Sequence, residues 1–282
     1  MPTPIDVDAF RAFEWNGWQE SADPYDAYFG PLTAQTIDPL LATVKADASP
    51  DGQPGALLDV ATGPGHLALR ARDAGFHPVL GVDFSEAMVR KARASCAGHG
   101  IEIREGDAEH LDSANEAFDA VTMNFGLLHL GQPAKAVAEA YRVLRKGGKY
   151  GFTVWAEPDK SRGFDLVLRA IEAHGGATES VPEGPPFFRY ASPANAAAIL
   201  SGGGFADPFV RELPLTWILP SGEALFDAFL RGTARTGGLL RRQTPAALSA
   251  IRAAIVKGAE AYASGGAIHV PMEAVLAAGT KR

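Results

Sequence analysis

Hydrophobic and polar positions alternate with two different periods through the middle of the chain. Short apolar runs bounded by turn residues predict β-strands at 56–61, 78–83, 101–106, 117–125 and 149–155. Between them, apolar residues recur with the period of an amphipathic helix at 65–74, 85–97 and 133–145. Pro133 is expected in the first turn of the last of these helices, which should stop at Gly147-Gly148. Strands and helices in alternation predict a parallel sheet with helices on both faces.

The pattern changes on both sides of this alternation. Residues 1–50 are rich in aromatic side chains and predict helices, and residues 49–55 (SPDGQPG) predict a loop. Beyond residue 155 we expect helices at 164–175, 193–201 and 222–263, with strands near 206–219 and 269–279. We interpret 156–190 and 222–264 as insertions that cap the ends of the strands.

Composition narrows the class of partner. A chain of 282 residues with 46% hydrophobic and 21% charged residues is typical of a soluble protein with one large domain, or a core with a cap. The acidic N-terminal stretch lacks the features of a signal peptide, and no run is long enough to cross a bilayer, so a cytoplasmic location without membrane association is expected. A net charge of −7 opposes nucleic-acid binding and favours a small-molecule partner. We expect a monomer or a homodimer.

Cysteine and histidine patterns argue against a metal site. The single cysteine, Cys96, excludes an internal disulfide and a cysteine-based zinc site. Seven histidines are present, and none forms an H-x-H or H-E-x-x-H motif. No metal is therefore expected.

A glycine-rich bend follows the first predicted strand, in the stretch LLDVATGPGHLALRARDAG (57–75). Gly63-x-Gly65-x-x-Ala68 satisfies the dinucleotide fingerprint, in which the backbone bends tightly before a helix. By itself this bend leaves NAD, FAD and S-adenosylmethionine open.

Three acids occur at the predicted strand ends with a constant spacing of 24 residues: Asp59, Asp83 and Asp107. Asp59 can accept hydrogen bonds from loop amides and from a ligand ammonium, and Asp83 can accept both ribose hydroxyls. Asp107 can meet an adenine amino group. Aspartate also commonly caps helices and opens turns, which is the alternative explanation of all three. These acids can bind one ribose and one adenine, but the sequence offers no matching residues for a second nucleotide. No tyrosine is followed four positions later by a lysine, the pair that a short-chain dehydrogenase uses for proton transfer.

Five consecutive stretches carry a specific resemblance: DVATGPGHLA, GVDFSEAMVRKAR, REGDAEHL, AFDAVTMNFGLLHL and AEAYRVLRKGGKYGFTVW. In order, they resemble the motifs of class I S-adenosylmethionine-dependent methyltransferases, in the branch that includes the ubiquinone/menaquinone-biosynthesis enzymes. The similar block spans roughly residues 55–156. The flanks resemble a bacterial subgroup of small-molecule methyltransferases whose acceptor the resemblance does not identify. The first glycine of the common loop is replaced by Ala61, a frequent substitution in this branch.

The resemblance implies S-adenosyl-L-methionine as cofactor, with S-adenosyl-L-homocysteine as product, and a role for each matching residue. Gly63, Gly65 and Ala61 would line the methionine part, near Asp59. The ribose would be held by Asp83 and the adenine would meet Phe84, Met88, Asp107 and Ala108, while Asn124 and Phe125 would lie beside the methyl group.

The resemblance also implies an α/β fold with a doubly wound, seven-stranded, mostly parallel Rossmann-like sheet and helical cap insertions. The expected organisation is an N-terminal helical lid (1–50), a cofactor-binding core (51–156), a cap insertion (157–190), core again with a helix and strand six (191–220), a helical cap insertion (221–265) and a last core strand (266–282).

Residues for catalysis and for the acceptor are less specific. His129, after the fourth strand, is the first candidate for a general base, and His174, in a cap helix, is the second. Either histidine could equally serve only the structure, while His66 more plausibly braces the glycine turn. The aromatic residues expected around the strand ends suggest an apolar acceptor pocket, and Arg189 and Arg235 could pair with an acceptor anion. The aromatic candidates are Tyr25, Tyr28, Phe29, Trp155, Phe187, Phe188 and Trp217.

The leading functional hypothesis is methyl transfer, by in-line displacement, to an O, N or C nucleophile of a small, aromatic, quinone-like or polyketide-like metabolite. A second hypothesis keeps the cofactor without the transfer, as in a cyclase-like or regulatory protein. A third is an NAD-dependent oxidoreductase, which the missing proton-relay pair disfavours.

Overall fold

The computed structural model describes residues 5–45, 54–177 and 179–282, so the first residues and most of the expected loop at 49–55 lie outside the described part. The chain forms two compact units, each built from several segments. Unit 1 comprises residues 1–32, 156–184 and 214–273, and unit 2 comprises residues 33–155, 185–213 and 274–282. No helix in the described ranges is both long enough and apolar enough to cross a membrane.

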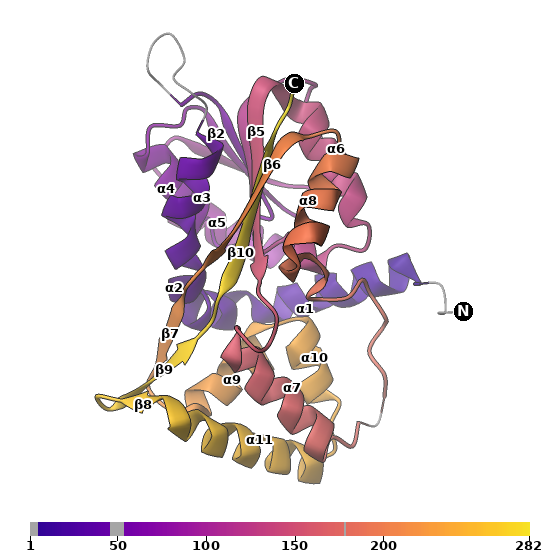
Figure 1. The fold of residues 1–282 in the computed structure, drawn as a ribbon, viewed down its shortest axis with the longest axis vertical. Helices are drawn as coiled ribbons and strands as arrows, with labels where there is room; N and C mark the ends of the chain where they lie inside the picture. Colours follow the sequence, from indigo (N-terminus) through magenta and orange to yellow (C-terminus); the bar gives the residue numbers. More distant parts are fainter. Residues whose placement is uncertain (1–4, 46–53, 178) are drawn as a thin grey trace. The chain divides into compact units, whose positions relative to one another are not determined.

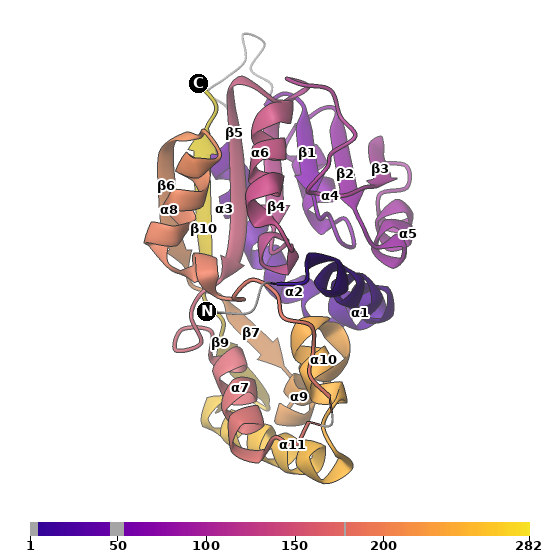
Figure 2. The same cartoon turned by 90° about the vertical axis from the view of Figure 1, so that its right-hand side faces the viewer.

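Unit 2 contains a seven-stranded mixed sheet, which confirms the predicted α/β fold. Its strands have the order β3-β2-β1-β4-β5-β10-β6, which can be followed from one edge to the other in Figure 2. Strands β1 to β5 pair in parallel, whereas β10 is antiparallel to both β5 and β6. The strands are β1 (Leu57–Val60), β2 (Val79–Asp83), β3 (Ile101–Glu105), β4 (Phe118–Asn124), β5 (Leu144–Trp155), β6 (Ala206–Leu213) and β10 (Ala274–Thr280).

Helices cover both faces of this sheet (Figure 1). One face is covered by α3 (Ile37–Val44), α4 (His66–Asp73) and α5 (Glu86–Ser95) and the other by α6 (Pro133–Val143) and α8 (Pro193–Gly202). Short 3-10 turns lie at Ala34–Thr36 (η1), Leu127–His129 (η2) and Arg189–Ala191 (η3). Because the chain winds outward in both directions from the neighbours β1 and β4, their carboxyl ends form the switch point where such sheets bind ligands.

The structure departs from the predicted elements at three places. Helix α6 ends at Val143, and β5 starts at Leu144, so the strand runs through Gly147-Gly148 instead of starting after them. The strand expected near 206–219 is two strands, β6 and β7 (Thr216–Leu219), in different sheets. The last expected strand is likewise two, β9 (Ala267–Pro271) and β10. Apolar alternation alone did not reveal these breaks, because both members of each pair continue the pattern.

Unit 1 is a helical layer with a small antiparallel sheet of order β7-β9-β8. Its elements are α1 (Val7–Tyr28), α7 (Arg162–His174), α9 (Gly222–Gly232), α10 (Arg235–Arg241), α11 (Pro245–Ala259), η4 (Glu260–Tyr262), β7, β8 (Ala263–Ser264) and β9, while α2 (Gly30–Thr33) lies at its boundary with unit 2. The lid and cap functions expected for these segments stay predictions.

Small residues bring α1 close to the rest of unit 1. A Cβ atom added to Gly17 would lie 2.6 Å from the Cβ of Ala234, which directly precedes α10. On the same face of α1, Phe10 and Trp18 are buried. The side chain at position 17 is therefore restricted by contact, not by backbone conformation.

We expect Gly17→Ala to lower the free energy of unfolding by about 1–3 kcal/mol, because the added methyl overpacks the contact with Ala234. Gly202→Ala is the matched control: a Cβ there meets nothing within 4 Å. That exchange should be neutral or stabilise by up to about 1 kcal/mol through helix propensity. Urea denaturation of both variants tests the contrast, and equal effects would refute it.

Candidate functional site

The glycine turn connects β1 to α4 through a series of left-handed residues. Ala61, Gly63 and Gly65 have φ values of 55°, 54° and 90°. A Cβ at Gly63 would meet nothing within 4 Å, so the backbone there is open to a ligand. A Cβ at Gly65 would lie 3.0 Å from the sulfur of Cys96, which packs the start of α4 against α5. The two glycines thus serve different purposes, access at Gly63 and close packing at Gly65.

Asp59 lies in β1, directly under this turn, and is only 1% exposed. One carboxylate oxygen accepts a hydrogen bond from the Thr62 hydroxyl at 2.6 Å, and the other accepts one from the Thr122 hydroxyl of β4 at 2.9 Å. These hydroxyl donors replace the loop amides expected from the sequence. Burial raises the pKa of Asp59 to about 7, partly offset by both hydroxyls. Asp59 therefore links the turn to the neighbouring strand.

Asp83 ends β2 and accepts hydrogen bonds from backbone amides. Its carboxylate accepts from Gly63 N at 2.9 Å and from Ser85 N at 2.9 Å, so it joins the glycine turn to the start of α5. Burial raises the pKa of Asp83 to about 6, while backbone amides and the nearby His129 act in the opposite direction. The carboxylate is placed at the strand end, as a ribose ligand would require.

The residues expected around an adenine follow β2 and β3. Phe84 is half-buried, and Met88 is buried in the first turn of α5, where its amide donates to the Ser85 hydroxyl. Asp107 is half-buried and accepts a hydrogen bond from Glu109 N at 2.8 Å, and Ala108 is buried beside it. The structure thus places this group on the carboxyl side of neighbouring strands.

Asn124, at the end of β4, has partners that the sequence did not predict. Its side-chain oxygen accepts hydrogen bonds from the hydroxyls of Thr36 and Thr153, and its side-chain nitrogen donates to the carbonyl of Thr33 at 3.3 Å. The amide therefore ties β4 to β5 and to the segment that leads into α3. This structural role accounts for its hydrogen bonds, and the expected position beside a methyl group stays a prediction.

Phe125 adopts a left-handed conformation with a φ of 56°, which is rare for a bulky residue. Its amide donates to the backbone and the side chain of Thr153, and its ring stacks on Trp155 at a centroid distance of 4.1 Å. Both rings are buried. Strained residues of this kind cluster at functional sites, which supports a functional role for this edge of the sheet.

His129 ends η2, beyond β4. Its ring meets the ring of Phe187 edge-to-face at 5.7 Å, and Phe187 in turn meets Phe188 at 5.0 Å. The histidine is half-buried and close enough to Asp83 to lower the pKa of that carboxyl. A base candidate and aromatic rings are therefore assembled within unit 2. Arg189, next in the chain, is exposed and lies over the ring of Tyr190 at 5.9 Å.

The remaining candidates belong to unit 1. Trp217 is 2% exposed, and its ring nitrogen donates to the carbonyl of Tyr28 at 2.9 Å. Its ring also lies 4.5 Å from that of Phe29, so its place is in the core of this unit and not on an open pocket wall. Tyr25 stacks on Phe29 at 5.7 Å. His174 is exposed at the end of α7.

Arg235 forms a salt bridge with the buried Glu14 at 3.8 Å and lies 5.0 Å from the ring centre of Phe10. These contacts hold α10 against α1 and give the guanidinium a structural partner in place of the acceptor anion considered from the sequence.

Sequence reasoning missed the threonines that organise this edge. Thr62, Thr122, Thr36 and Thr153 donate their hydroxyls to Asp59 or Asn124. For Thr122 and Thr153 a signal existed, since each is a polar residue inside an apolar strand pattern. Thr36 carried none, because its partner lies 88 residues away.

This chain is similar in sequence to known methyltransferases. Residues 58–152 match the family described as methyltransferase domain. A demethylmenaquinone methyltransferase of Thermus thermophilus is 34% identical over 175 residues, which are 57% of this chain and 78% of that protein. A ubiquinone/menaquinone biosynthesis C-methyltransferase of Desulfotalea psychrophila is 41% identical over 101 residues, 35% of this chain and 41% of that protein.

Among solved structures, phosphoethanolamine N-methyltransferase 2 of Haemonchus contortus, in complex with S-adenosyl-L-methionine, has a TM-score of 0.57 at 18% identity. The alignment covers 97% of this chain and 60% of that chain. At this identity the likeness shows the fold.

We expect Asp83→Ala to weaken binding of S-adenosylhomocysteine at least tenfold. A hydrogen bond to a charged group contributes about 1.5–3 kcal/mol, and the exchange removes a carboxylate suited to two ribose hydroxyls. Asp38→Ala, which removes an exposed carboxylate paired with Arg70, should leave the affinity unchanged. Titration calorimetry measures both, and an unaltered affinity of the Asp83 variant would show that the ribose lies elsewhere.

Asp59→Asn should change how stability depends on pH. Because the pKa of Asp59 is about 7 in the folded chain and near 4 when unfolded, the folded state retains a proton that the unfolded state loses between these values. This carboxyl therefore lowers the free energy of unfolding as the pH rises from about 4 to about 7, by about 1.4 kcal/mol per unit of pKa difference.

The asparagine variant lacks this loss and should gain stability relative to the wild type across that window, with no further change above it. Urea denaturation between pH 4.5 and 8 gives the difference. A difference independent of pH would contradict the buried, proton-retaining carboxyl.

Proposed function

The chain belongs to the class I S-adenosylmethionine-dependent methyltransferases, in the branch of the ubiquinone and menaquinone biosynthesis enzymes, and we propose that it methylates a small hydroxylated aromatic or quinone-like metabolite. Its cofactor is S-adenosyl-L-methionine. Membership in this family removes the NAD-dependent oxidoreductase from consideration, and the missing tyrosine–lysine pair agrees with that. We propose a carbon atom of the acceptor's ring as the methylated atom; the name of the C-methyltransferase relative supports carbon over oxygen or nitrogen.

The residues of unit 2 fit such a cofactor. Gly63 leaves its backbone accessible, and the Asp83 carboxylate at the end of β2 gives this edge a negative charge suited to a ligand with a sulfonium and an ammonium group. Asp107 and Ala108 lie past the end of β3, and we assign contact with the adenine to them. When bound, the cofactor supplies a methyl group on a positively charged sulfur, so the protein needs mainly to align the acceptor and exclude water.

The observation that carries the acceptor proposal is the contact of His129 with the Phe187 ring. Phe188 extends this aromatic surface. Trp155, the last residue of β5, and Phe125, which follows β4, form a second, buried stacked pair. Flat apolar walls beside one titratable group suit a planar ring that carries a hydroxyl. Arg189, which follows Phe188 in the chain and is exposed, is a candidate partner for an anionic acceptor. The acceptor contacts expected from the sequence for Tyr25 and Tyr28 stay predictions.

In the proposed reaction His129 accepts the proton of the acceptor hydroxyl. The resulting oxyanion would raise the electron density at the neighbouring ring carbon, the atom that would receive the methyl group supplied by the bound cofactor. That ring carbon would then lose its own proton and regain aromaticity, and the acceptor oxygen would take back the proton held by His129, so the net change is replacement of a ring hydrogen by a methyl group with release of one proton.

Transfer of labelled methyl from the cofactor to a dihydroxynaphthalene or hydroquinone tests this proposal. His129→Ala should lower kcat about 100-fold, in the range for loss of a general base, with little change in the KM for the cofactor. His99→Ala, an exposed histidine after α5, is the matched control, and His174→Ala should also keep full activity. Tight cofactor binding without any label transfer would favour the cofactor-binding alternative, and an unchanged kcat for His129→Ala would exclude this base.

A further inference from the structure

The connection from β3 to β4, residues 106–117, crosses the sheet without a helix of its own. Its residues form turns with one isolated bridge between Asp107 and His110. Peptide groups in such a segment need partners outside a regular helix or strand. This segment begins with Asp107 and Ala108, the residues proposed to meet the adenine, so whatever holds it also determines where they lie.

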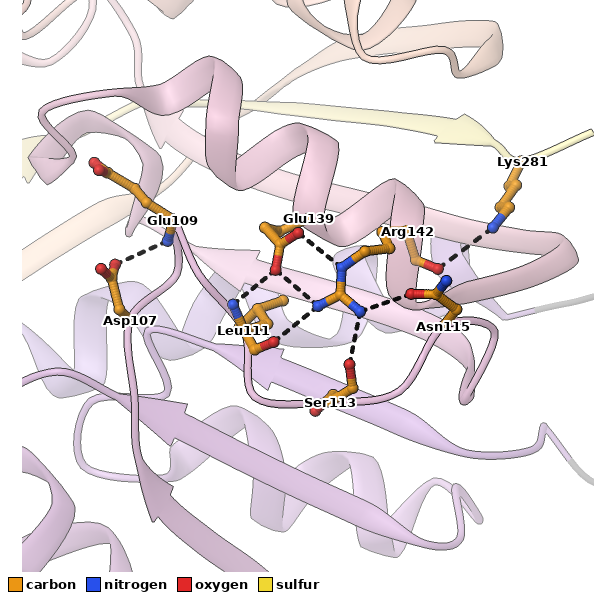
Figure 3. Close-up of polar contacts among 8 residues, drawn as sticks. All are labelled: Asp107, Glu109, Leu111, Ser113, Asn115, Glu139, Arg142 and Lys281. Atoms are coloured by element: carbon orange, nitrogen blue, oxygen red, sulfur yellow. Dashed lines mark hydrogen bonds and ion pairs between the residues drawn. The ribbon is translucent and has the colours of Figure 1, made fainter.

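Two side chains of α6, Glu139 and Arg142, supply those partners (Figure 3). The guanidinium donates twice to the Glu139 carboxylate, at 2.8 and 2.7 Å. It also donates to the carbonyls of Leu111 and Ser113 and to the side-chain oxygen of Asn115, at 2.8, 2.7 and 2.9 Å. All five of its N–H groups are thus used within the protein, which leaves none for an anionic ligand.

Leu111 is held on both sides of its backbone by this ion pair. Its amide donates to Glu139 at 2.8 Å, while its carbonyl accepts from Arg142. Its side chain is 4% exposed. The pairing with Arg142 lowers the pKa of Glu139, so the carboxylate stays ionised at neutral pH and remains an acceptor.

The turn that precedes Leu111 is therefore fixed at both ends. At its start, Gly106 N donates to the carbonyl of Asp83 at 2.9 Å, next to the proposed ribose site. Within it, Asp107 accepts from Glu109 N, and the Glu109 carboxylate accepts from Gln132 N at 2.8 Å, just before α6. At its end, Glu139 and Arg142 hold the backbone of Leu111.

We propose that Glu139 and Arg142 are positioning residues for adenine recognition: by holding Leu111, Ser113 and Asn115 against α6, they set the position of Asp107 relative to the ribose site. This inference rests on the proposed cofactor site and adds to it two residues that touch neither cofactor nor acceptor. It predicts that removing the pair of Glu139 and Arg142, here called the clamp, lowers the preference of the protein for adenine over a different base. This effect would come in addition to any general loss of cofactor affinity.

The test compares two probes that differ at one position of the base, S-adenosylhomocysteine and S-inosylhomocysteine, in which an oxo group replaces the 6-amino group. A carboxylate at Asp107 prefers the amino donor, so the wild type should bind the adenine form about tenfold more tightly, the scale of one hydrogen bond to a charged group. Arg142→Ala should remove most of this preference. Arg252→Ala, which breaks an exposed ion pair with Glu223 in unit 1, should keep it.

The ratio of the two dissociation constants is the deciding quantity, because a variant that is merely less stable loses folded protein without changing the ratio. Glu139→Gln, which keeps the side-chain shape but has one acceptor oxygen fewer, is the second variant in case Arg142→Ala does not fold, and it should also lower the ratio. Equal weakening of both probes in these variants would overturn the proposal.

Asp107→Ala separates this failure from failure of the proposed site. If that variant loses the preference while Arg142→Ala and Glu139→Gln retain it, the adenine site stands and the positioning role is refuted. If the wild type and Asp107→Ala both lack a preference, the assignment of Asp107 to the adenine is itself wrong.

Discussion

The arrangement of residues at the carboxyl edge of the sheet depends on the hydrogen bonds of one buried carboxyl group, that of Asp59. Asp59 lies opposite Thr122 in the pairing of β1 with β4, and a charge in that buried position is costly unless hydrogen-bond donors surround it. The Thr62 hydroxyl comes from the glycine turn and the Thr122 hydroxyl from the neighbouring strand. Satisfying this group therefore aligns the turn with β4. Asp83, in the neighbouring strand β2, acts in the same way by accepting a hydrogen bond from the Gly63 amide. The glycine turn is therefore held by side chains of two strands.

Two residues at the same edge of the sheet have a strained backbone conformation. Ala61 and Phe125 end adjacent strands in left-handed conformations, which L-residues with a side chain adopt at a cost of about 1–2 kcal/mol. The two bends approach closely, because a Cβ on Gly126 would lie 2.6 Å from the Cβ of Ala61. Glycine at 126 is thus required by contact with the alanine that replaces the first glycine of the common loop. Hydrogen bonds from the Phe125 amide to Thr153, together with the stacked Trp155 ring, hold Phe125 in place.

Local pattern was enough to predict the central elements, and tertiary contacts explain the misses. The first four strands of the sheet and helices α4 and α5 lie within a few residues of their expected places, because each has its own periodicity and its own turn residues. The split of 206–219 into β6 and β7 depends on which partner strand each half finds, and that choice leaves no mark in the alternation. The roles of Glu139 and Arg142 were hidden for the same reason, since an acid and a base three residues apart on a helix look like an ordinary surface pair.

By itself, the sequence determined the alternating fold, the glycine turn, the three acids at strand ends and the family to which they belong, because all of these are written in short segments with fixed spacing. Only the tertiary structure decided what each side chain faces. Asp59 accepts hydrogen bonds from two threonine hydroxyls, and the side chain of Asn124 donates one to a distant segment near residue 33. Trp217 is buried in the core of unit 1. Hydrogen bonds join residues that are up to 189 positions apart. Such partners are selected by packing of the whole chain, and no local pattern records them.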